Sequence, residues 1–524
     1  MGDVSDAWVD LPEVYNAAED FVGRNIDQGR SDKAAFIDPN NILTYGALQD
    51  GMDRFAGGLH KLGVAREQRV ALIMFDTVDM PIAFWGAIKA GIVPVPINTL
   101  LAADQYQYIL ADCRATCLIV SAGLMEKIEP ILGTLPHLRN VIVSDGDGHG
   151  DAPNFSDLLS NSLPIGEAAD TVADETAFWL YSSGSTGMPK GVRHRHSSLI
   201  NTAKLFGEDV LGIRENDVCY SAAKIFFAYG LGNAMSFPMS VGATTILLPG
   251  RPTPDAVMDI MRRHKPTLFF GVPTLYTAML AHPDLEQGAG SPALRLCVSA
   301  GEPLPKDIGE RWRDKVGSDI LDGIGSTEML HIFVSNRPGQ ITYGASGVPV
   351  PGYAARIVDD EGHDLGDGEI GELVVKGPSS GDGYWNQTAK SNKTFVGPWT
   401  HTGDKYRREA DGIYYYCGRT DDMFKVSGIW VSPFDVESAL VTHEAVLEAA
   451  VVGHEDADGL LKPKAFLILN KGVIADDALF TDLKEHVKTI AGPWKYPRWI
   501  EVRDEFPKTA TGKIQRFKLR AGTD

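Results

Sequence analysis

An alternation of strand-like and helix-like segments in the first half of the chain constrains the fold most strongly. Arg69–Phe75 reads RVALIMF, a continuous apolar run of strand length. Val78–Gly91 has the apolar spacing of a helix and ends at a glycine, and Ile92–Ile97 has the composition of the next strand. Strands that are apolar throughout are buried on both faces, as in the parallel sheets of strand–helix–strand units. We therefore predict an α/β fold built on largely parallel sheets.

The same pattern recurs further along the chain and implies more than one parallel unit. Four more segments read as buried strands, and the two members of each pair flank a stretch of helix length: Thr116–Val120 and Asn140–Val143, then Thr267–Phe270 and Leu294–Ser299. The chain has 524 residues, and globular domains hold about 100–200 residues. We expect three or four units, some of them fused into one lobe.

The texture changes after about Gly347. Segments such as YAARIVDD, GEIGELVVKG and DGIYYYCGR are short, rich in β-formers and separated by Asp-Gly and Glu-Gly turns. They predict a small antiparallel β-barrel or sheet near residues 347–420, appended to the α/β part. Residues 1–420 would then form one large N-terminal lobe.

A last unit is predicted from Asp421 to the end, residues 421–524. Pro433–Val441 has a helical pattern, and Leu479–Ile490 is amphipathic with helical spacing. Val446–Gly453 and Lys464–Leu469 read as strands between them. This composition predicts a small α+β domain.

Charge and composition exclude several classes of protein. The net charge of −20 argues against a nucleic-acid binder and against an anionic membrane surface as partner. Ile225–Gly250 carries no charge and is long enough to span a bilayer, but its glycines and prolines favour a loop, a buried helix and a core strand at Ala243–Leu248. The acidic N-terminus is not a signal peptide.

The five cysteines are scattered and odd in number, which favours reduced thiols over a disulfide framework. Cys113 and Cys117 form a C-x3-C pair, but no second Cys/His pair completes a zinc site. We expect a cytoplasmic protein.

The segment Tyr181–Gly191, YSSGSTGMPKG, has the chemistry of a phosphate-binding loop. Hydroxyl side chains supply donors, Gly184 and Gly187 allow close backbone approach, and Lys190 supplies a positive charge. The Walker A loop needs Gly-Lys-Ser/Thr, which is absent here. A flexible Ser/Gly linker is the alternative, and the apolar strand directly before the loop disfavours it.

The loop resembles the phosphate loop of the adenylate-forming superfamily, which includes acyl- and aryl-CoA synthetases, luciferases and the adenylation domains of peptide synthetases. Other family motifs follow in the same order, so the resemblance covers nearly the whole chain: Ser299–Pro303, Asp322–Glu328, Thr402–Asp404, Gly418–Asp422 and Pro507–Arg516. It implies that a carboxylate attacks the α-phosphate of Mg²⁺·ATP, and that a thiol then displaces AMP from the acyl-adenylate.

The resemblance also implies which residues contact the nucleotide. The ATP/AMP-binding set would be Ser182, Ser183, Gly184, Ser185, Thr186, Gly187, Lys190, Ala300, Gly301, Glu302, Pro303, Asp322, Gly323, Ile324, Gly325, Ser326, Asp404 and Arg419. Asp404 would hold both ribose hydroxyls, since one carboxylate accepts from two adjacent donors. Without the family, Arg419 would read as part of a solvated charged turn.

Four residues would serve the first half-reaction. Thr327 would contact the α-phosphate, Glu328 and Thr186 would help hold Mg²⁺, and Lys513 would reach the substrate carboxylate. For the second half-reaction the resemblance makes Asp421 the hinge on which the small domain turns. The CoA tunnel would be lined by Lys425, Ser427, Gly428 and Trp430.

The acyl pocket would be lined by Phe227, Ala228, Tyr229, Gly230, His331 and Ile332. These side chains suggest a flat apolar slot, and the stretch FFAYGLGNAMSFPM resembles benzoate–CoA ligases. No Asp stands where an amino-acid substrate would need one. Two roles remain open for His331, either facing the substrate or packing as a core histidine.

The resemblance therefore implies a benzoate–CoA ligase that uses ATP and CoA, without a nucleic-acid or membrane partner, and a homodimer is one assembly it allows. An enzyme that loads a carrier-protein thiol is an alternative, as is a ligase for hydroxybenzoate or cyclohexane carboxylate. A non-catalytic nucleotide sensor belongs to a different class; the joint presence of Glu328, Asp404 and Lys513 argues against it.

Overall fold

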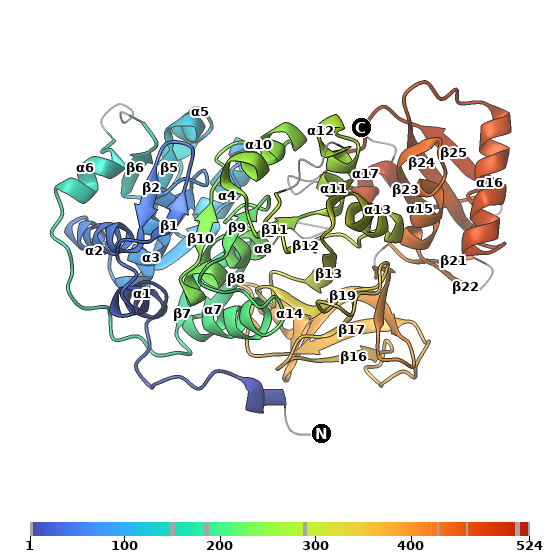
Figure 1. Cartoon of the computed structure of the whole chain (residues 1–524). Helices are drawn as coiled ribbons and strands as arrows, with labels where there is room; N and C mark the ends of the chain where they lie inside the picture. Colours follow the sequence, from blue (N-terminus) through green and yellow to red (C-terminus); the bar gives the residue numbers. More distant parts are fainter. Residues whose placement is uncertain are drawn as a thin grey trace.

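The computed structural model describes residues 4–146, 152–182, 188–286, 291–420, 422–426, 429–456, 460–508 and 514–521. Figure 1 shows a large lobe that contains both parallel-sheet parts of the α/β region and a smaller C-terminal unit at one end. The predicted α/β fold is confirmed: parallel sheets form the core of the large lobe, and the C-terminal unit is α+β.

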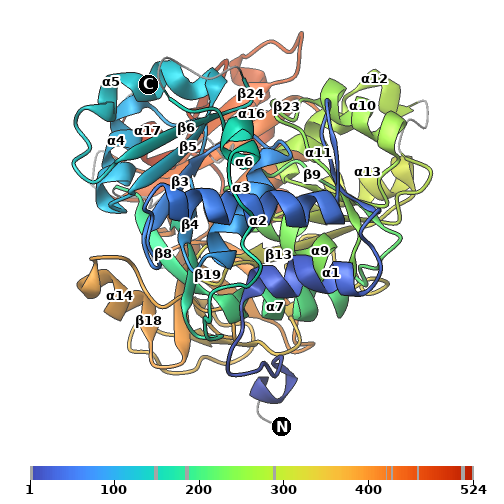
Figure 2. The ribbon, with the colours of Figure 1, turned by 90° about the vertical axis from the view of Figure 1, so that its left-hand side faces the viewer.

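The first parallel sheet contains the strand–helix–strand unit predicted from residues 69–97. Its strand order is β4-β3-β5-β6, and every pairing is parallel. The strands are β3 Arg69–Ile73, β4 Val93–Pro96, β5 Cys117–Ser121 and β6 Asn140–Ser144. The helices that follow them are α3 Asp79–Lys89, α4 Ala103–Asp112 and α5 Met125–Leu132. In Figure 2 the long helix α2, Tyr45–Lys61, crosses in front of this sheet and packs on α3.

The second sheet is larger and runs β15-β14-β13-β12-β11-β9-β10-β1-β2. Its central strands are parallel, and its edges close with antiparallel strands. The strands are β1 Ala34–Ile37, β2 Ile42–Thr44, β9 Val218–Ser221, β10 Thr244–Ile246, β11 Leu268–Gly271, β12 Leu296–Ser299, β13 Ile320–Gly325, β14 Ile332–Ser335 and β15 Val348–Pro349. The strands predicted at 267–270 and 294–299 are the neighbours β11 and β12.

The uncharged stretch Ile225–Gly250 is a set of short buried helices that ends in a core strand. They are α8 Ala228–Leu231, η5 Gly232–Ser236 and α9 Phe237–Val241, and β10 follows. Within the described residues, no helix combines the length and apolar character needed to cross a membrane.

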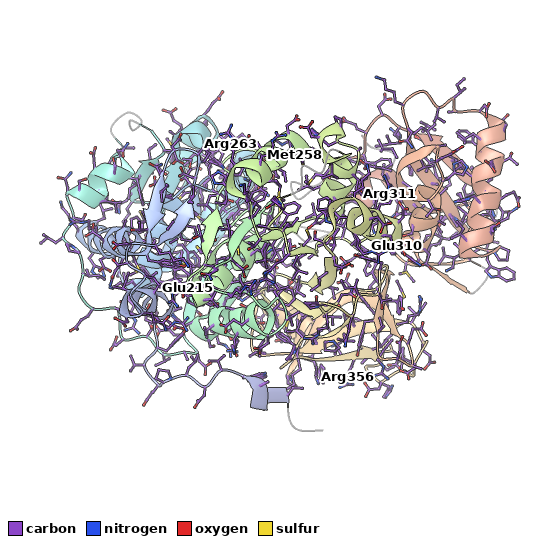
Figure 3. All side chains as sticks on the ribbon, in the orientation of Figure 1. Glu215, Met258, Arg263, Glu310, Arg311 and Arg356 are labelled. Atoms are coloured by element: carbon purple, nitrogen blue, oxygen red, sulfur yellow. The ribbon has the colours of Figure 1, made fainter. Side chains whose placement is uncertain are left out.

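Helices on the outside of the second sheet are amphipathic. In α10, Pro254–His264, Met258 is fully buried, and Arg263 lies on a different face of the helix (Figure 3). The helix α13, Lys306–Val316, carries Glu310 and Arg311. The other helices of the large lobe are η1 Val4–Ala7, η2 Glu19–Gly23, α1 Arg24–Asp27, η3 Ala122–Leu124, α6 Phe155–Ser160, α7 His196–Thr202, η4 Ala203–Glu208, α11 Pro273–Leu280, α12 Pro283–Glu286 and α14 Thr388–Thr394.

The β-rich region after residue 347 is a curled antiparallel half-barrel. Strand β19 pairs with β17, β18 and β20, and β16 pairs with β17. The strands are β16 Ala354–Val358, β17 Gly371–Lys376, β18 Phe395–Val396, β19 Trp399–Arg408 and β20 Tyr414–Arg419. The sheet stays open where a closed barrel would join its edges.

The C-terminal unit has its own apolar core. A three-stranded sheet, ordered β23-β24-β25, packs against two helices, and a hairpin precedes it. The elements are β21 Phe424–Val426, β22 Ile429–Val431, α15 Pro433–Val441, β23 Val446–Glu455, β24 Leu461–Leu469, α16 Asp477–Ala491, β25 Trp499–Val502 and α17 Arg516–Ala521.

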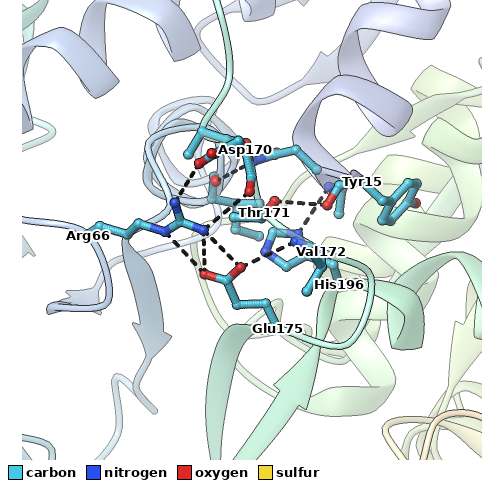
Figure 4. Close-up of polar contacts among 11 residues, drawn as sticks. Tyr15, Arg66, Asp170, Thr171, Val172, Glu175 and His196 are labelled. Atoms are coloured by element: carbon cyan, nitrogen blue, oxygen red, sulfur yellow. Dashed lines mark hydrogen bonds and ion pairs between the residues drawn. The ribbon is translucent and has the colours of Figure 1, made fainter. Parts of the chain in front are cut away.

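Polar contacts tie the N-terminal segment to the large lobe (Figure 4). The Tyr15 amide donates to the Thr171 carbonyl, and the Thr171 hydroxyl donates to the Tyr15 carbonyl. The Ala17 amide donates to Nδ1 of His196 at 3.1 Å. Burial lowers the pKa of His196 to about 4, and the nearby Arg66 adds to the shift, so this imidazole is neutral and accepts at Nδ1. The anchor therefore depends on an uncharged histidine.

Candidate active site

The predicted nucleotide segments lie together because they follow neighbouring parallel strands. Ser299 at the end of β12 is the register partner of Asp322 in β13. Ala300–Pro303, which follows β12, and Gly323–Ser326, the end of β13 with the residue after it, therefore lie at the same edge of the second sheet. Ligands bind at the carboxyl edge of such sheets, where loops from adjacent strands meet.

The phosphate loop joins the two strands of a hairpin, β7 Thr176–Ser182 and β8 Lys190–Arg195. Ser182 and Lys190 are register partners at the mouth of the loop. The Ser182 hydroxyl is buried and has no hydrogen-bond partner among the described residues. A buried donor without a partner at this position fits an anionic ligand, because leaving it unpaired is unfavourable.

Lys190 meets Glu328 through a tyrosine that the sequence reasoning did not single out. Lys190 Nζ donates to the Tyr384 hydroxyl at 3.3 Å and lies 4.4 Å from the centre of the Tyr384 ring. The Tyr384 hydroxyl donates to Glu328 Oε1 at 2.8 Å. Burial lowers the pKa of Lys190, the Glu328 carboxylate opposes this shift, and Lys390 and Arg419 add to it. A Gly-Asp-Gly segment precedes Tyr384 in the sequence, but it gives no sign of the contacts with Lys190 and Glu328.

Asp404 and Arg419 face the same region from the half-barrel. They are register partners on β19 and β20, and Arg419 Nη1 donates to Asp404 Oδ1 at 3.0 Å. Arg419 also donates to the Thr402 carbonyl at 3.2 Å. The guanidinium thus fixes the carboxylate that the sequence assigns to the ribose.

Asp322 is a buried acid within β13. Burial raises its pKa to about 8, although the Leu304 and Gly323 amides favour the charged form. The Leu304 amide donates to Oδ2 at 3.3 Å. Burial thus disfavours the negative charge of this carboxyl group.

Nearby, the Met329 amide donates to the Ser326 hydroxyl at 3.2 Å and the Leu330 amide donates to the Thr327 carbonyl at 3.2 Å. These bonds form a turn after β13. Glu328 lies within this turn, and the Gly381 amide donates to its carbonyl at 2.8 Å. The backbone on both sides of Glu328 is therefore held in place.

The predicted acyl segments pack against each other. His331 is buried, its Nε2 lies 3.2 Å from the Tyr229 carbonyl, and its ring contacts those of Phe206 and Phe237. Burial lowers the pKa of His331 to about 3, so the ring is neutral. In the structure His331 packs among these rings, as a core histidine does.

The Tyr229 hydroxyl is also engaged. It donates to the carbonyls of Gly271 and Val298 at 3.2 and 3.1 Å, at the ends of β11 and β12. Its ring is thereby fixed beside that of His331.

The helices that carry the acyl segment leave little room for larger residues. A Cβ on Gly230 would lie 2.0 Å from the Lys224 carbonyl oxygen, and one on Gly232 would lie 2.5 Å from Cδ2 of His331. Ala228 and Ile332 are buried, and Phe227 is half-buried with its ring edge-on to Phe226. The segment therefore forms an apolar wall of tightly defined shape.

Several predicted site residues lie outside the described residues. They are Ser183, Gly184, Ser185, Thr186, Gly187, Asp421, Ser427, Gly428 and Lys513. For Lys425 and Trp430 only the backbone is described, in β21 and β22.

A large α/β lobe with a curled half-barrel, followed by a small α+β unit, is the architecture of adenylate-forming enzymes. A family model described as AMP-binding enzyme matches residues 24–385, and one described as AMP-binding enzyme C-terminal domain matches residues 435–513. The chain belongs to the AMP-binding enzyme family.

Similar proteins extend over nearly the whole chain. A 4-hydroxybenzoate–CoA/benzoate–CoA ligase from Rhodopseudomonas palustris is 56% identical, over 97% of this chain and 94% of its own. A benzoate–CoA ligase from Thauera aromatica is 53% identical, over 98% and 97%. The crystal structure of a benzoate CoA ligase from Burkholderia xenovorans LB400 superposes with a TM-score of 0.90 at 49% identity, covering 97% of this chain and 100% of that one.

Proposed function

We propose that this chain is a benzoate–CoA ligase that forms benzoyl-CoA in two steps. In the first, a benzoate oxygen attacks the α-phosphorus of ATP and pyrophosphate leaves, giving benzoyl-AMP. In the second, the thiol sulfur of CoA attacks the acyl carbon, AMP leaves and the thiol proton is released. The similarity over nearly the whole chain to ligases for benzoate carries the proposal.

The phosphate end of ATP would meet Ser182, the loop after it and Lys190. The Ser182 hydroxyl is a buried donor that has no acceptor among the described residues. Lys190 is a half-buried cation, and an anion beside it offsets the free-energy cost of removing its charge from water. Asp404 would accept from the ribose hydroxyls while Arg419 holds it. Thr327 would donate to the α-phosphate, where charge develops during adenylation.

Mg²⁺ fits this donor set. Carboxylate oxygens are the ligands it prefers, and Glu328 stands next to Lys190 with one oxygen bound to Tyr384. Glu328, with Thr186, would hold the ion beside the phosphates. Bound there, Mg²⁺ supplies neutralisation of phosphate charge.

The C-terminal unit would serve both half-reactions in turn. We assign residues 1–420 to the large domain and 421–524 to the mobile one, with Asp421 as the hinge. In adenylation Lys513 would meet the carboxylate and the α-phosphate. After rotation, the segment with Lys425, Ser427, Gly428 and Trp430 would line the path of CoA. Domain alternation of this kind lets one module complete two active sites.

The benzoate ring would lie against Phe227, Ala228, Tyr229, Gly230 and Ile332. His331 is neutral and buried behind Tyr229, so it would form the floor of the pocket without adding charge. An uncharged, flat slot suits an aryl ring better than an amino acid or a long acyl chain. Hydroxybenzoates and cyclohexane carboxylate are the related acids that such a slot can admit.

The test is a substrate panel with ATP, Mg²⁺ and CoA, read as AMP release. Benzoate should show the highest kcat/KM among benzoate, hydroxybenzoates, fluorobenzoates, cyclohexane carboxylate and short fatty acids. Preference for a fatty acid would contradict the proposal. ATP binding without pyrophosphate release would indicate a sensor, and transfer to a carrier-protein thiol with none to free CoA would indicate a loading enzyme. Light scattering of the purified enzyme tests whether it is a homodimer. Fractionation of the cells that produce it tests a cytoplasmic location.

A further inference from the structure

A segment of the half-barrel lies along strand β8 of the phosphate hairpin. The Asp382 amide donates to the Arg193 carbonyl at 2.9 Å, and the Trp385 amide donates to the Gly191 carbonyl at 2.8 Å. Tyr384 lies between these two bonds and forms a bridge pair with Val192. Backbone pairing across almost two hundred residues of sequence therefore determines where the Tyr384 side chain lies.

That side chain places one hydroxyl between a cation and an anion. A lysine ammonium only donates and a carboxylate only accepts, so the hydroxyl must accept from Lys190 and donate to Glu328 Oε1. The direction of both hydrogen bonds is thus set. Tyr384 is 5% exposed, and Phe395 packs edge-on to its ring.

Lys190 and Glu328 meet through this hydroxyl and not through a direct ion pair, as far as the described residues extend. A direct pair would bring the two charges together and fill the space between them. The tyrosine holds them apart instead and binds Oε1 of Glu328, while Oε2 makes no hydrogen bond among the described residues.

We propose that Tyr384 is a positioning residue for adenylation, whose hydroxyl orients Glu328 toward the cation of Mg²⁺·ATP and holds Lys190 at the place where it meets the phosphates. The inference rests on the proposed function, since it assigns a role within that same site. When phosphate oxygens take over the donation from Lys190, the hydroxyl keeps its bond to Glu328. Groups that are oriented before the ligand arrives lose less entropy on binding.

The decisive variant is Tyr384→Phe, which keeps the ring and removes only the hydroxyl. Loss of a hydrogen bond to a charged group corresponds to about 10- to 100-fold in affinity or rate. We expect Mg²⁺·ATP binding, measured by calorimetry without any acid, to weaken about tenfold. Benzoate-dependent pyrophosphate exchange should fall about 10- to 100-fold, while thioester formation from supplied benzoyl-AMP stays within about twofold.

The matched control is Tyr414→Phe. Tyr414 is equally buried and its hydroxyl donates to the Ala355 carbonyl at 2.9 Å, away from Lys190 and Glu328. It should leave Mg²⁺·ATP binding at the wild-type value. A double variant with Glu328→Gln adds a test of pathway, because the effects of the two substitutions should be less than additive if Tyr384 acts in part through Glu328.

Three outcomes would overturn the role of Tyr384: wild-type Mg²⁺·ATP affinity in Tyr384→Phe, equal loss of both half-reactions, or additive effects with Glu328→Gln. Failure of the proposed function is distinguishable from these. If the wild-type enzyme does not activate benzoate, the substrate panel shows it, while the calorimetry still reports on Tyr384 because no acid is present.

Discussion

Arg419 Nη1 donates to Asp404 Oδ1 at 3.0 Å across two paired strands of the half-barrel. The side chain of Asp404 is 13% exposed, whereas that of Arg419 is 42% exposed. An exposed cation thus holds a more buried anion in one orientation. Because this carboxylate is already restrained, it loses less rotational freedom when it accepts from two ribose hydroxyls.

Asp404→Asn should therefore impair binding of ATP more than turnover. The amide keeps one acceptor oxygen but adds an NH₂ group, so one ribose bond and the attraction to Arg419 are lost. We expect KM for ATP to rise about 10- to 100-fold with a smaller change in kcat. AMP release at varied ATP concentrations measures both constants.

Asp367→Asn is the control for that substitution. Asp367 pairs with Arg408, on the same strand β19, at an exposed site. Exposed pairs contribute little, so its KM for ATP should stay at the wild-type value. An equal rise in both variants would mean that charge loss anywhere on the half-barrel is responsible, and the ribose role of Asp404 would be wrong.

Tyr229→Phe tests whether the phenol recognises a hydroxyl on the substrate ring. Its hydroxyl already donates to Gly271 and Val298, so we expect the ratio of kcat/KM for benzoate and 4-hydroxybenzoate to stay within about twofold. Stability should fall by about 1 kcal/mol, the typical contribution of a neutral hydrogen bond. A selective loss of 4-hydroxybenzoate activity would show that the hydroxyl turns toward the substrate.

Ala228 is predicted to govern ring-substituent tolerance. Ala228→Leu adds bulk at a buried wall, and substituted rings should suffer more than benzoate itself. Some hydroxybenzoates or fluorobenzoates carry a substituent that would clash with the added leucine side chain. For these acids we expect kcat/KM to fall about tenfold relative to benzoate, since a clash costs about 1–3 kcal/mol. An unchanged substrate profile would place the ring elsewhere.

Local signals allowed most of the fold to be predicted. Pro433–Val441 was predicted as a helix and is one, with the Ser432 hydroxyl accepting from the Asp435 amide at 3.2 Å and Pro433 at the first position. Strand β25 was missed, because all four of its residues are only half-buried and no alternation of apolar and polar side chains identifies it.

The same distinction between local and distant signals holds for the candidate site. Ser182, the last residue of β7, could be placed at the end of a strand because the apolar run before it is visible in the sequence, whereas the strand that contains Asp322 was not predicted. Tyr384 could not be placed, because its role depends on pairing with β8, far away in the chain. The packing of His331 also depends on distant rings, so sequence alone left its role open.

Lys513→Ala should separate the two half-reactions. If Lys513 meets the carboxylate and α-phosphate, benzoate-dependent pyrophosphate exchange should fall by about 100-fold or more, since a charge that stabilises the transition state is lost. Thioester formation from supplied benzoyl-AMP and CoA should remain near wild type.

The control is Lys508→Ala, which removes a nearby lysine paired with Glu448. It should leave both half-reactions unaffected. If Lys513→Ala slows both steps to the same degree, the residue supports the C-terminal unit in general, and the assignment to adenylation is refuted.

His196 should make the stability of the large lobe depend on pH. Its pKa is about 4 in the folded protein, lowered by burial, against about 6.5 in an unfolded chain. The unfolded state thus binds the proton more readily, so the contribution of His196 is complete above pH ~6.5 and declines as the pH falls toward 4. The slope is about 1.4 kcal/mol per pH unit, and between pH 7.5 and 5 the loss is about 2 kcal/mol.

Other buried groups titrate in the same range, and some act in the opposite direction. The raised pKa of Asp322, about 8, makes acid stabilising for that residue. The measurement is therefore a difference between wild type and His196→Asn, whose amide oxygen can still accept from the Ala17 amide. Urea unfolding of both proteins at several pH values should show the wild-type advantage shrinking by about 2 kcal/mol from pH 7.5 to 5. A difference that stays constant with pH would mean that His196 has the same pKa in the folded enzyme as in the unfolded chain.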